Sequence, residues 1–537
     1  MATGLATGGP APDATAELPA ADQHARLARI RARLVVPLPR DVLWGWLGPL
    51  LVTGLAAYLR FHRLGVPQAK VFDEVYYSHD AWSLLHHGVE LNAHDNGPGF
   101  VVHPPLGKWM IAFGEWVFGY NSYGWRFSAA LVGTLSVLIL ARTARRMFGS
   151  TLLGCLAGLL LALEALEFVQ SRVAMLDIFL MFWVVAGFAC LVIDRDDGRR
   201  RLAERMEEWP ASARGRGPWL GVRWWRLGVG ICAGAACATK WSGVWFVIAF
   251  FLLAWAWDAG ARRAAGIRHP RRAALLLDGL PSIVLLLLVP AMVYVLSWLG
   301  WFMATGATAW DHDKFVHPGQ GWFAHAVAVV HGWVSYHREV YNFHVHLDAG
   351  HPYKSEPWGW LLLARPVAYF YSSPDLGQLG CHAQQCSREV LAIGTPAIWW
   401  ASIPALLWTI WVWVARRDWR ATAVLWGFGA GYVVWLAFPS RTMFLFYALP
   451  AVPFMILGLT LAAGSLLGRA RTTLLRRRWA AAAVGAFALL VVANFFYLYP
   501  ILAAKVIPQS EWHDRMWFRQ CTSASSDHTV EVAPCWI

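Results

Sequence analysis

Long apolar runs alternate with short polar segments over most of this chain. Eleven runs approach or exceed the length that crosses the hydrocarbon layer of a bilayer, which takes roughly 20 residues of α-helix. The spans we predict cover residues 43–60, 125–147, 151–169, 173–193, 226–240, 242–257, 274–302, 394–415, 420–438, 442–465 and 479–500. The pattern therefore predicts an all-α integral membrane protein with about 11 transmembrane helices.

The basic residues indicate how these spans are oriented. Thirty of the 46 Lys and Arg residues fall in six polar stretches, at 1–40, 142–146, 194–226, 262–272, 416–420 and 469–478. Basic residues collect on the cytoplasmic side of membrane spans. With an odd number of spans, all six stretches lie on that side if the N-terminus is cytoplasmic and the C-terminus external. The net charge of +13 is then a topology signal, and we expect no nucleic-acid partner.

Composition supports the membrane interpretation and divides the chain into three parts. Charged residues make up only 15% of the sequence, whereas soluble proteins carry about 25%. Residues 1–40 lack the apolar run of a signal peptide, and we expect a flexible cytoplasmic tail there. Residues 41–517 form one transmembrane domain, followed by an external tail at 518–537.

Two external loops are long enough to suggest a function of their own. The loop at 61–124 is rich in polar and aromatic residues, and its apolar end, 106–118, is predicted to be a short interfacial helix. The loop at 303–392 holds nine of the 19 histidines. We expect the chemistry of the protein to lie on this external face.

The external cysteines are candidates for disulfide bonds. Cys381 and Cys386 form one close pair, and Cys521 and Cys535 form another. Disulfides persist outside the cytoplasm, so pairing within each couple is predicted. A zinc site that uses His382 is the alternative at the first pair.

Adjacent carboxylates in the first loop are the leading catalytic candidates. Asp73 and Glu74 lie between apolar and aromatic neighbours, Phe72 and Val75. A carboxylate at a low-dielectric surface has its pKa raised towards the range that a general base requires. The alternative is a loop acid held in a salt bridge.

Isolated cations mark the external ends of several spans. Arg126, Arg172, Lys240 and Arg441 come from four different turns, without acids nearby in the sequence. Such a set suits the phosphate of a lipid held at the membrane surface, although single cations also snorkel to the interface. His103 and Lys108 flank a Pro-Pro turn that positions either a phosphate or a hydroxyl, or is purely structural.

An ordered set of segments resembles the protein O-mannosyltransferase family, and most closely its actinobacterial members. The segments are FDEVYY at 72–77, HPPLGK at 103–108, GWRF at 124–127, SRVAMLDIFL at 171–180, TKWSG at 239–243, CSREV at 386–390 and RTMFLFYALPAVPF at 441–454. The resemblance extends from about residue 55 to residue 517, and the region 303–392 is its least similar part.

This resemblance implies a GT-C glycosyltransferase fold and an inverting transfer of mannose. The implied donor is polyprenyl-phosphate-mannose, and the implied acceptors are Ser or Thr hydroxyls of exported polypeptides. It also implies a multi-pass protein of the plasma membrane that works on the external face, in contact with membrane lipid and the export machinery. By the same resemblance Asp73 corresponds to the catalytic acid, Glu74 to its neighbour, Arg126 to the arginine that opens the second span, and Arg60 to a preceding arginine.

The mechanism we predict is a single displacement. Asp73 removes the proton of the acceptor hydroxyl, while Glu74 orients a substrate or is itself the base. Arg172, Lys240 and Arg441 hold the donor phosphate, with His103 and Arg126 nearby. We expect no cofactor and no metal, although Asp311, His312 and Asp313 carry groups that could bind a divalent ion.

Two other functions remain open at this point. A glycosyltransferase of the same fold could modify a lipid or a glycan in place of a protein. A transporter is the alternative from another class, but transporters usually contain internal repeats, and none is evident here.

Overall fold

The computed structural model describes residues 20–92, 97–100, 102–209, 215–304, 315, 317, 319–468, 473–518 and 536. Among these residues, eight helices are long and apolar enough to cross a membrane, as judged by length and composition. They are Val42–Phe61, Ser122–Phe148, Leu176–Glu208, Trp241–Ala264, Pro270–Ser297, Pro396–Arg416, Leu445–Leu467 and Leu474–Leu502.

The elements follow the chain in a nearly all-helical order. The first half comprises α1 (Ala20–Leu34), α2 (Val42–Phe61), α3 (Glu74–His87), α4 (Leu106–Phe118), α5 (Ser122–Phe148), α6 (Thr151–Ala162), α7 (Ala165–Gln170), α8 (Leu176–Glu208), α9 (Trp224–Thr239) and α10 (Val244–Ala264). The second comprises α11 (Pro270–Ala273), α12 (Leu280–Ile283), α13 (Val289–Ser297), α14 (Leu299–Met303), α16 (Trp322–Val345), α17 (Pro357–Trp360), β1 (Val367–Ser372), β2 (Cys386–Ala392), α18 (Pro396–Arg416), α19 (Trp419–Gly431), α20 (Val452–Leu467), α21 (Leu474–Leu502), β3 (Ile507–Pro508) and α22 (Gln509–Arg515).

Three of the predicted spans are shorter than expected. Residues 151–169 form α6 and α7, which are separated by a break at Leu163 and Glu164. The predicted span 226–240 is the 16-residue helix α9, and 420–438 is the 13-residue helix α19 followed by a 3₁₀ turn. Apolar pattern alone does not locate these ends, because single polar residues such as Glu164 and Lys240 interrupt otherwise apolar sequence there.

The N-terminal tail is more ordered than predicted. The expectation of a flexible segment over residues 1–40 is wrong for residues 20–34, which form α1. Ile30 and Leu34 of this helix are buried with Leu202 and Met206 of α8. This apolar contact explains why a mostly polar segment forms an ordered helix, because Ile30 and Leu34 pack against the bundle.

A small antiparallel sheet corrects the all-α prediction. Its order is β1-β2-β3, and it is formed within the second loop and by the residues after α21. Cys381 and Cys386 are joined by a disulfide in the β1–β2 hairpin, as predicted, so their sulfurs are not zinc ligands. Cys521, Cys535, and the candidate metal ligands Asp311, His312 and Asp313 lie outside the described residues.

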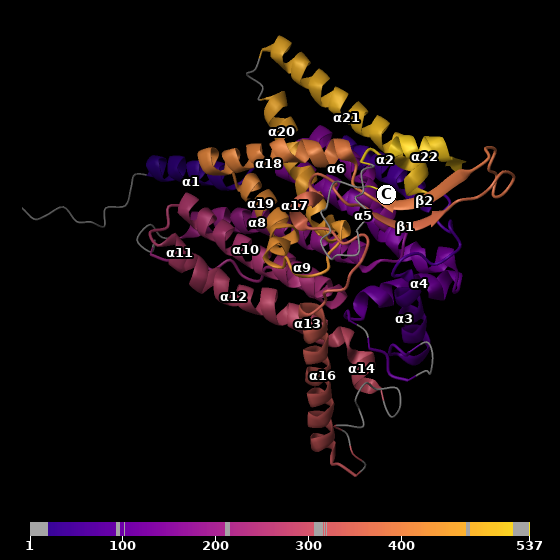
Figure 1. The fold of residues 1–537 in the computed structure, drawn as a ribbon. Coiled ribbons are helices and arrows are strands. Elements are labelled where there is room, and N and C mark those ends of the chain that lie inside the picture. The colour runs from indigo at the N-terminus through magenta and orange to yellow at the C-terminus, as the bar shows by residue number, and fades with distance from the viewer. Residues whose placement is uncertain are drawn as a thin grey trace, which may run out of the picture.

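The first external loop contains α3 and α4, and α4 has the bounds predicted from the sequence. The side chain of Asn121 accepts hydrogen bonds from the backbone at Tyr123 and Gly124, which starts α5. A Cβ atom on Gly124 would lie 2.0 Å from the Gly119 carbonyl oxygen, so glycine is required for this close approach of α4 and α5. Figure 1 shows α3, α4 and the sheet at the end of the bundle opposite α1.

Candidate active site

The turn that carries the two acids is held by an aromatic cluster. Phe72 has a left-handed backbone (φ 48°), which is unfavourable for a bulky residue and requires support from its surroundings. Its ring lies 4.8 Å from that of Tyr369 on β1, and 5.9 and 5.8 Å from those of Phe444 and Phe446. The sheet therefore fixes the position of Asp73, the next residue.

Asp73 occupies the N-terminus of α3 and is the candidate base. Burial raises its pKa to about 6, with a smaller contribution from the carboxylate of Asp177 and against the opposing effect of Lys240. The Tyr77 hydroxyl lies 3.5 Å from Asp73 Oδ2, a long contact that leaves the carboxylate available. A carboxyl with this pKa is mostly ionised at neutral pH and still basic enough to accept a proton.

Lys240 reaches the same region from the end of α9. Its Nζ lies 3.0 and 3.1 Å from the two carboxylate oxygens of Asp177 and 4.9 Å from the centre of the Tyr447 ring. Both members of this ion pair are largely buried. Asp177 lies within SRVAMLDIFL, a segment quoted for the family resemblance, but no role was predicted for it.

Arg441 approaches the same tyrosine ring. Its guanidinium carbon lies 5.6 Å from the Tyr447 ring centre, and one of its nitrogens donates to Nδ1 of His344 over 3.1 Å. Because Nε2 of His344 donates to the carbonyl of Val102 over 2.8 Å, Nδ1 carries the lone pair. The Nε atom of Arg441 is buried and has no hydrogen-bond partner among the described residues.

His103 lies among these groups. Its ring centre is 6.3 Å from that of Tyr77 and 5.3 Å from that of His344. Burial, and then the charge of Lys240, hold the pKa of His103 well below its usual range. It is therefore a neutral imidazole at physiological pH. The structure thus brings together Asp73, His103, Lys240 and Arg441, four of the predicted site residues.

Glu74 has a different environment from its neighbour. Its side chain is 0% exposed, and its two oxygens lie 2.7 and 2.8 Å from nitrogens of Arg126. The same oxygens accept hydrogen bonds from the backbone N–H groups of Val71 and Ala174. Glu74 therefore ties the acid-bearing turn to α5 and to the segment before α8.

Two further arginines also bind protein groups. Arg172 donates to four backbone carbonyls, those of Leu59, Arg60, His62 and Arg63. A cation is favourable there because the last carbonyls of a helix such as α2 lack partners. Arg60 is fully buried and forms an ion pair with Glu167.

Lys108 is enclosed in a similar way. Its Nζ lies 3.0 Å from Asp80 and 3.3 Å from Glu90. The two carboxylates raise the pKa of Lys108 against the effect of burial. This lysine therefore joins α3, α4 and the segment between them.

These contacts correct one expectation and identify residues that sequence reasoning missed. The expectation that the rim cations lack acidic partners is wrong for Arg126 and Lys240, which pair with Glu74 and Asp177. Asp177 and His344 are the missed site residues. The position of Asp177 inside the segment SRVAMLDIFL was a usable signal. His344 was one of nine histidines in a loop without a recognisable pattern.

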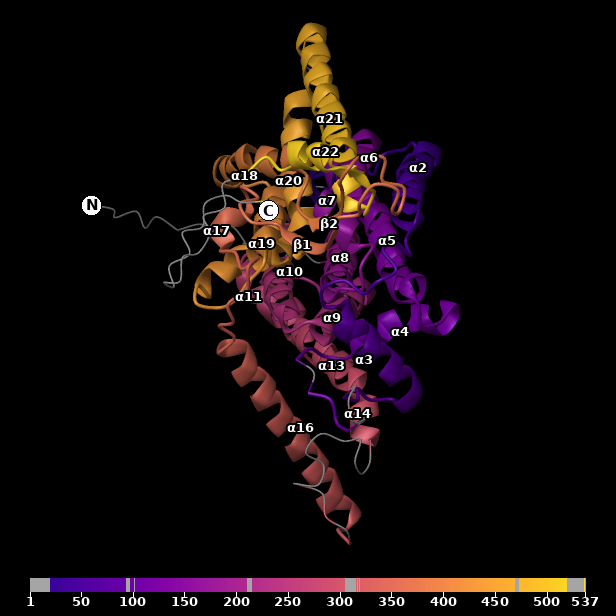
Figure 2. The same ribbon diagram turned by 45° about the vertical axis from the view of Figure 1, so that its right-hand side comes forward.

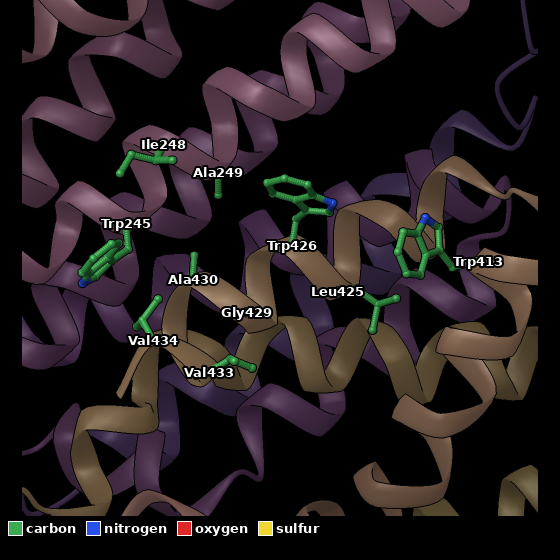
Figure 3. Close-up of a pocket in the computed structure, with 10 residues that line it drawn as sticks. All are labelled: Trp245, Ile248, Ala249, Trp413, Leu425, Trp426, Gly429, Ala430, Val433 and Val434. Atoms are coloured by element: carbon green, nitrogen blue, oxygen red, sulfur yellow. The ribbon is translucent and has the colours of Figure 1, made fainter. Parts of the chain in front are cut away.

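An apolar groove opens beside the two site cations. It has a volume of about 490 Å³ and is lined by residues of α10, of α18 and of α19 with the turn that follows it. Figure 3 shows Trp245 on α10 facing Val433 and Val434. Trp245 is five residues after Lys240, and Val434 precedes Trp435, whose ring centre is 6.0 Å from the Arg441 guanidinium. One end of the groove is therefore lined by residues that are close in the chain to Lys240 and to a neighbour of Arg441.

No group of three or more His, Cys, Asp or Glu side chains with metal-binding geometry occurs in the part of the chain that the structure describes. The nitrogen donors around Asp73 are those of Lys240, Arg441 and two neutral histidines. Such an arrangement suits an anion more than a cation.

Comparison with known proteins places the chain in a family. Residues 50–299 match the family model described as dolichyl-phosphate-mannose-protein mannosyltransferase. Residues 329–521 match the model of the C-terminal four-TMM region of protein-O-mannosyltransferase.

Individual relatives agree with these matches. A polyprenol-phosphate-mannose–protein mannosyltransferase of Mycobacterium tuberculosis is 41% identical over 488 residues, which cover 89% of this chain and 92% of the relative. A Corynebacterium glutamicum enzyme of the same name is 35% identical over 523 residues, which cover 93% and 98%.

The fold is also similar to a solved structure, the Saccharomyces cerevisiae protein O-mannosyltransferase Pmt1-Pmt2 complex bound to the sugar donor. The TM-score is 0.67 at 16% identity, over 92% of this chain and 94% of the matched chain. The resemblance predicted from the sequence motifs is confirmed, and the chain belongs to the protein O-mannosyltransferase family.

Proposed function

We propose that this enzyme transfers mannose from polyprenyl-phosphate-mannose to Ser or Thr hydroxyls of proteins, with Asp73 as the general base. The observation that supports this most directly is the arrangement at one site of a carboxylate whose pKa is raised to about 6 and two cations, Lys240 and Arg441. The carboxylate suits proton removal, and the cations suit a phosphate leaving group.

The reaction is an inverting single displacement. The acceptor hydroxyl oxygen attacks C1 of mannose and forms the new glycosidic bond, while its proton passes to Asp73. The bond between C1 and the phosphate oxygen breaks, and the polyprenyl phosphate leaves with the electron pair. Lys240 and Arg441 stabilise the negative charge that this phosphate gains, and the neutral His103 donates or accepts a hydrogen bond beside it.

Glu74 has a supporting role in this proposal. All of its acceptor capacity towards the site is used by Arg126 and two backbone N–H groups. Arg60, Arg126, Arg172 and Lys108 likewise bind protein acceptors and hold the site in place, and do not contact the donor. The base is therefore assigned to Asp73 alone.

The apolar groove suits the polyprenyl chain of the donor. Its lining is almost entirely aliphatic and aromatic, and it ends near Lys240 and Arg441. A lipid tail in the groove would place its phosphate at the two cations without burying any charge in the hydrocarbon layer. The enzyme then holds the donor by its tail and by its phosphate.

For the topology we propose that α6 with α7, α9 and α19 also cross the membrane, which gives 11 crossings. The basic N-terminal helix α1 and the site lie at opposite ends of the bundle (Figure 1). With α1 in the cytoplasm, the site faces the exterior of the plasma membrane, where exported polypeptides pass.

A transfer assay tests the proposal. Membranes that contain the enzyme are given polyprenyl-phosphate-mannose and a Thr/Pro-rich peptide, in the presence of EDTA, and the mannosylated peptide is measured. The control is Glu115→Gln, at a buried carboxyl of α4 that has no hydrogen-bond partner among the described residues. Transfer by the wild type and by Glu115→Gln, and its loss in Asp73→Asn, would support the assignment. Transfer to an added lipid or glycan, and none to the peptide, would contradict it.

A further inference from the structure

Helix α16 has two apolar faces, and one of them is packed. Tyr336 and Val340 are buried together with Trp298. The ring centres of Trp298 and Tyr336 are 5.6 Å apart, and Trp301 of α14 adds a second aromatic contact to the same tyrosine. This face attaches α16 to the end of the span that ends in α13.

The other apolar face is largely exposed, as far as the described residues show. Its residues recur at the three- and four-residue spacing that forms one stripe along a helix. Their side chains are 37–67% exposed: Phe323, Val327, Val330, Val334, Tyr341 and Val345. His331, Ser335 and Asn342 lie on the next side of the helix, so the stripe has a polar border. Arg338 and Glu339 are the charged residues of α16.

The direction of α16 fits a surface helix. In Figure 1 it projects below the bundle and runs at a large angle to α21, one of the candidate spans, and Figure 2 shows that it extends well beyond the other helices. With 24 residues it extends about 36 Å at 1.5 Å per residue. A helix that runs crosswise to membrane spans lies roughly parallel to the membrane plane.

Exposed apolar residues also occur on the candidate membrane span to which α16 is attached. Leu296, at the end of the span Pro270–Ser297, is 62% exposed, and Leu299 and Met303 of α14 beside it are exposed as well. A water-soluble partner bound to the stripe would leave these neighbouring apolar residues exposed to water. Lipid would cover the stripe and these residues together. The shortage of charge on α16 disfavours a partner recognised by ion pairs.

We propose that α16 is an interfacial helix whose exposed stripe lies in the lipid leaflet on the side of the active site. Aromatic residues such as Phe323 and Tyr341 are favoured at this depth, and the polar border faces the headgroups and water. Near its C-terminal end the helix carries His344, which contacts Arg441 and the segment at Val102. Helix α16 thus connects the membrane surface to the site. Its contact with lipid does not depend on which sugar is transferred.

Photochemical labelling of the full-length protein tests this surface. A diazirine amino acid is placed at Val330 and, as a matched control one residue away, at His331. Both positions are exposed, and they are about 100° apart around the helix. The protein is reconstituted in vesicles of phosphatidylethanolamine and phosphatidylglycerol and irradiated, and the adducts are identified by mass spectrometry. Elution as a single species in detergent before reconstitution verifies folding.

We expect severalfold more phospholipid adduct at Val330 than at His331, because the control lies on the polar side of the helix, where its ring centre is 4.6 Å from that of Phe315. Equal labelling by lipid at the two positions, or reaction with water alone at Val330, would overturn the proposal. A cross-link between two copies of the chain at Val330 would also overturn it, because the stripe would then be a contact between proteins.

Discussion

Arg126 and Arg441, both predicted to lie at the external ends of spans, have opposite environments. Arg126 is fully buried and donates from all three guanidinium nitrogens, to both oxygens of Glu74 and to three backbone carbonyls. Arg441 donates to one histidine nitrogen, and its Nε atom has no partner among the described residues. Each stands at the end of an apolar run without an acid nearby in the sequence, so both were predicted to bind the donor.

The difference teaches that unused donors, and not charge alone, identify a substrate-binding cation. A guanidinium whose donors are all satisfied by the protein stabilises the fold, because any substrate would need to displace a protein acceptor. A guanidinium with a free donor beside a base can bind an incoming phosphate. The same rule separates Asp73, with one long contact, from Glu74, with four short ones.

The largest expected effect comes from Asp73→Asn. General-base catalysis contributes roughly 10²- to 10⁴-fold, so the rate of mannose transfer should fall by about that factor. The amide is isosteric and Asp73 has no ion pair at hydrogen-bond distance, so the melting temperature should change little. The initial rate and the melting temperature are measured beside Glu115→Gln. Near-wild-type transfer by Asp73→Asn would remove this residue from the mechanism.

Glu74→Gln should act on stability. Removing one member of a buried ion pair leaves an uncompensated charge, here that of Arg126, and typically costs about 3–5 kcal/mol. The yield of folded protein and its thermal inactivation temperature in detergent should both fall, and the double variant Glu74→Gln with Arg126→Met should recover part of the loss. A stable Glu74→Gln enzyme without transfer activity would instead place Glu74 in the chemistry.

Arg441→Met should weaken donor binding more than it lowers the stability of the fold. A hydrogen bond to a charged group contributes about 1.5–3 kcal/mol, which corresponds to an increase of roughly 10- to 150-fold in KM for the donor. Arg441→Lys keeps the charge and should recover part of the affinity. Kinetics at varied donor concentration measure the effect. An unchanged KM, or a loss of stability as large as that of Glu74→Gln, would contradict the comparison.

The pH dependence tests the ionisation of Asp73. Because the base works in its ionised form and its pKa is about 6, kcat/KM should rise with pH through about 6 and then level off. At pH 5 it should be about tenfold below the plateau. Asp177→Asn removes a carboxylate that raises the pKa of Asp73, so its profile should move to lower pH. An unchanged midpoint in this variant would show that another group controls the profile.

The smallest effect is expected for His344→Ala. Arg441 loses the acceptor that orients it but keeps its charge and its own contact with the phosphate, so the loss should be about 0.5–1.5 kcal/mol, or roughly two- to tenfold in KM for the donor. His344→Gln offers an acceptor oxygen and should retain more affinity than alanine. Combined with Arg441→Met, the histidine change should add little, because the two act through one contact. Fully additive effects would show that His344 acts independently.

The pattern of apolar and polar residues was sufficient to predict the elements that depend only on residues close in the chain and on the surrounding lipid. In a bilayer every backbone group is satisfied within its own helix, so an apolar run of sufficient length specifies a span without reference to the rest of the chain. For this reason eight predicted spans have counterparts among the long helices, and the bounds of α4 were correct. Close cysteines predicted the disulfide in the same way, and the motifs identified the family.

Tertiary structure alone decided which of the charged residues face the site. Glu74 and Arg126 are 52 residues apart in the chain, and Asp177 and Lys240 are 63 apart. Spacing of that size carries no information on contact, whereas the energy of a buried charge depends almost entirely on its nearest partners. The sequence by itself therefore determined the membrane helices and indicated Asp73 as the candidate base, and the packing of distant helices determined which cations keep unsatisfied donors.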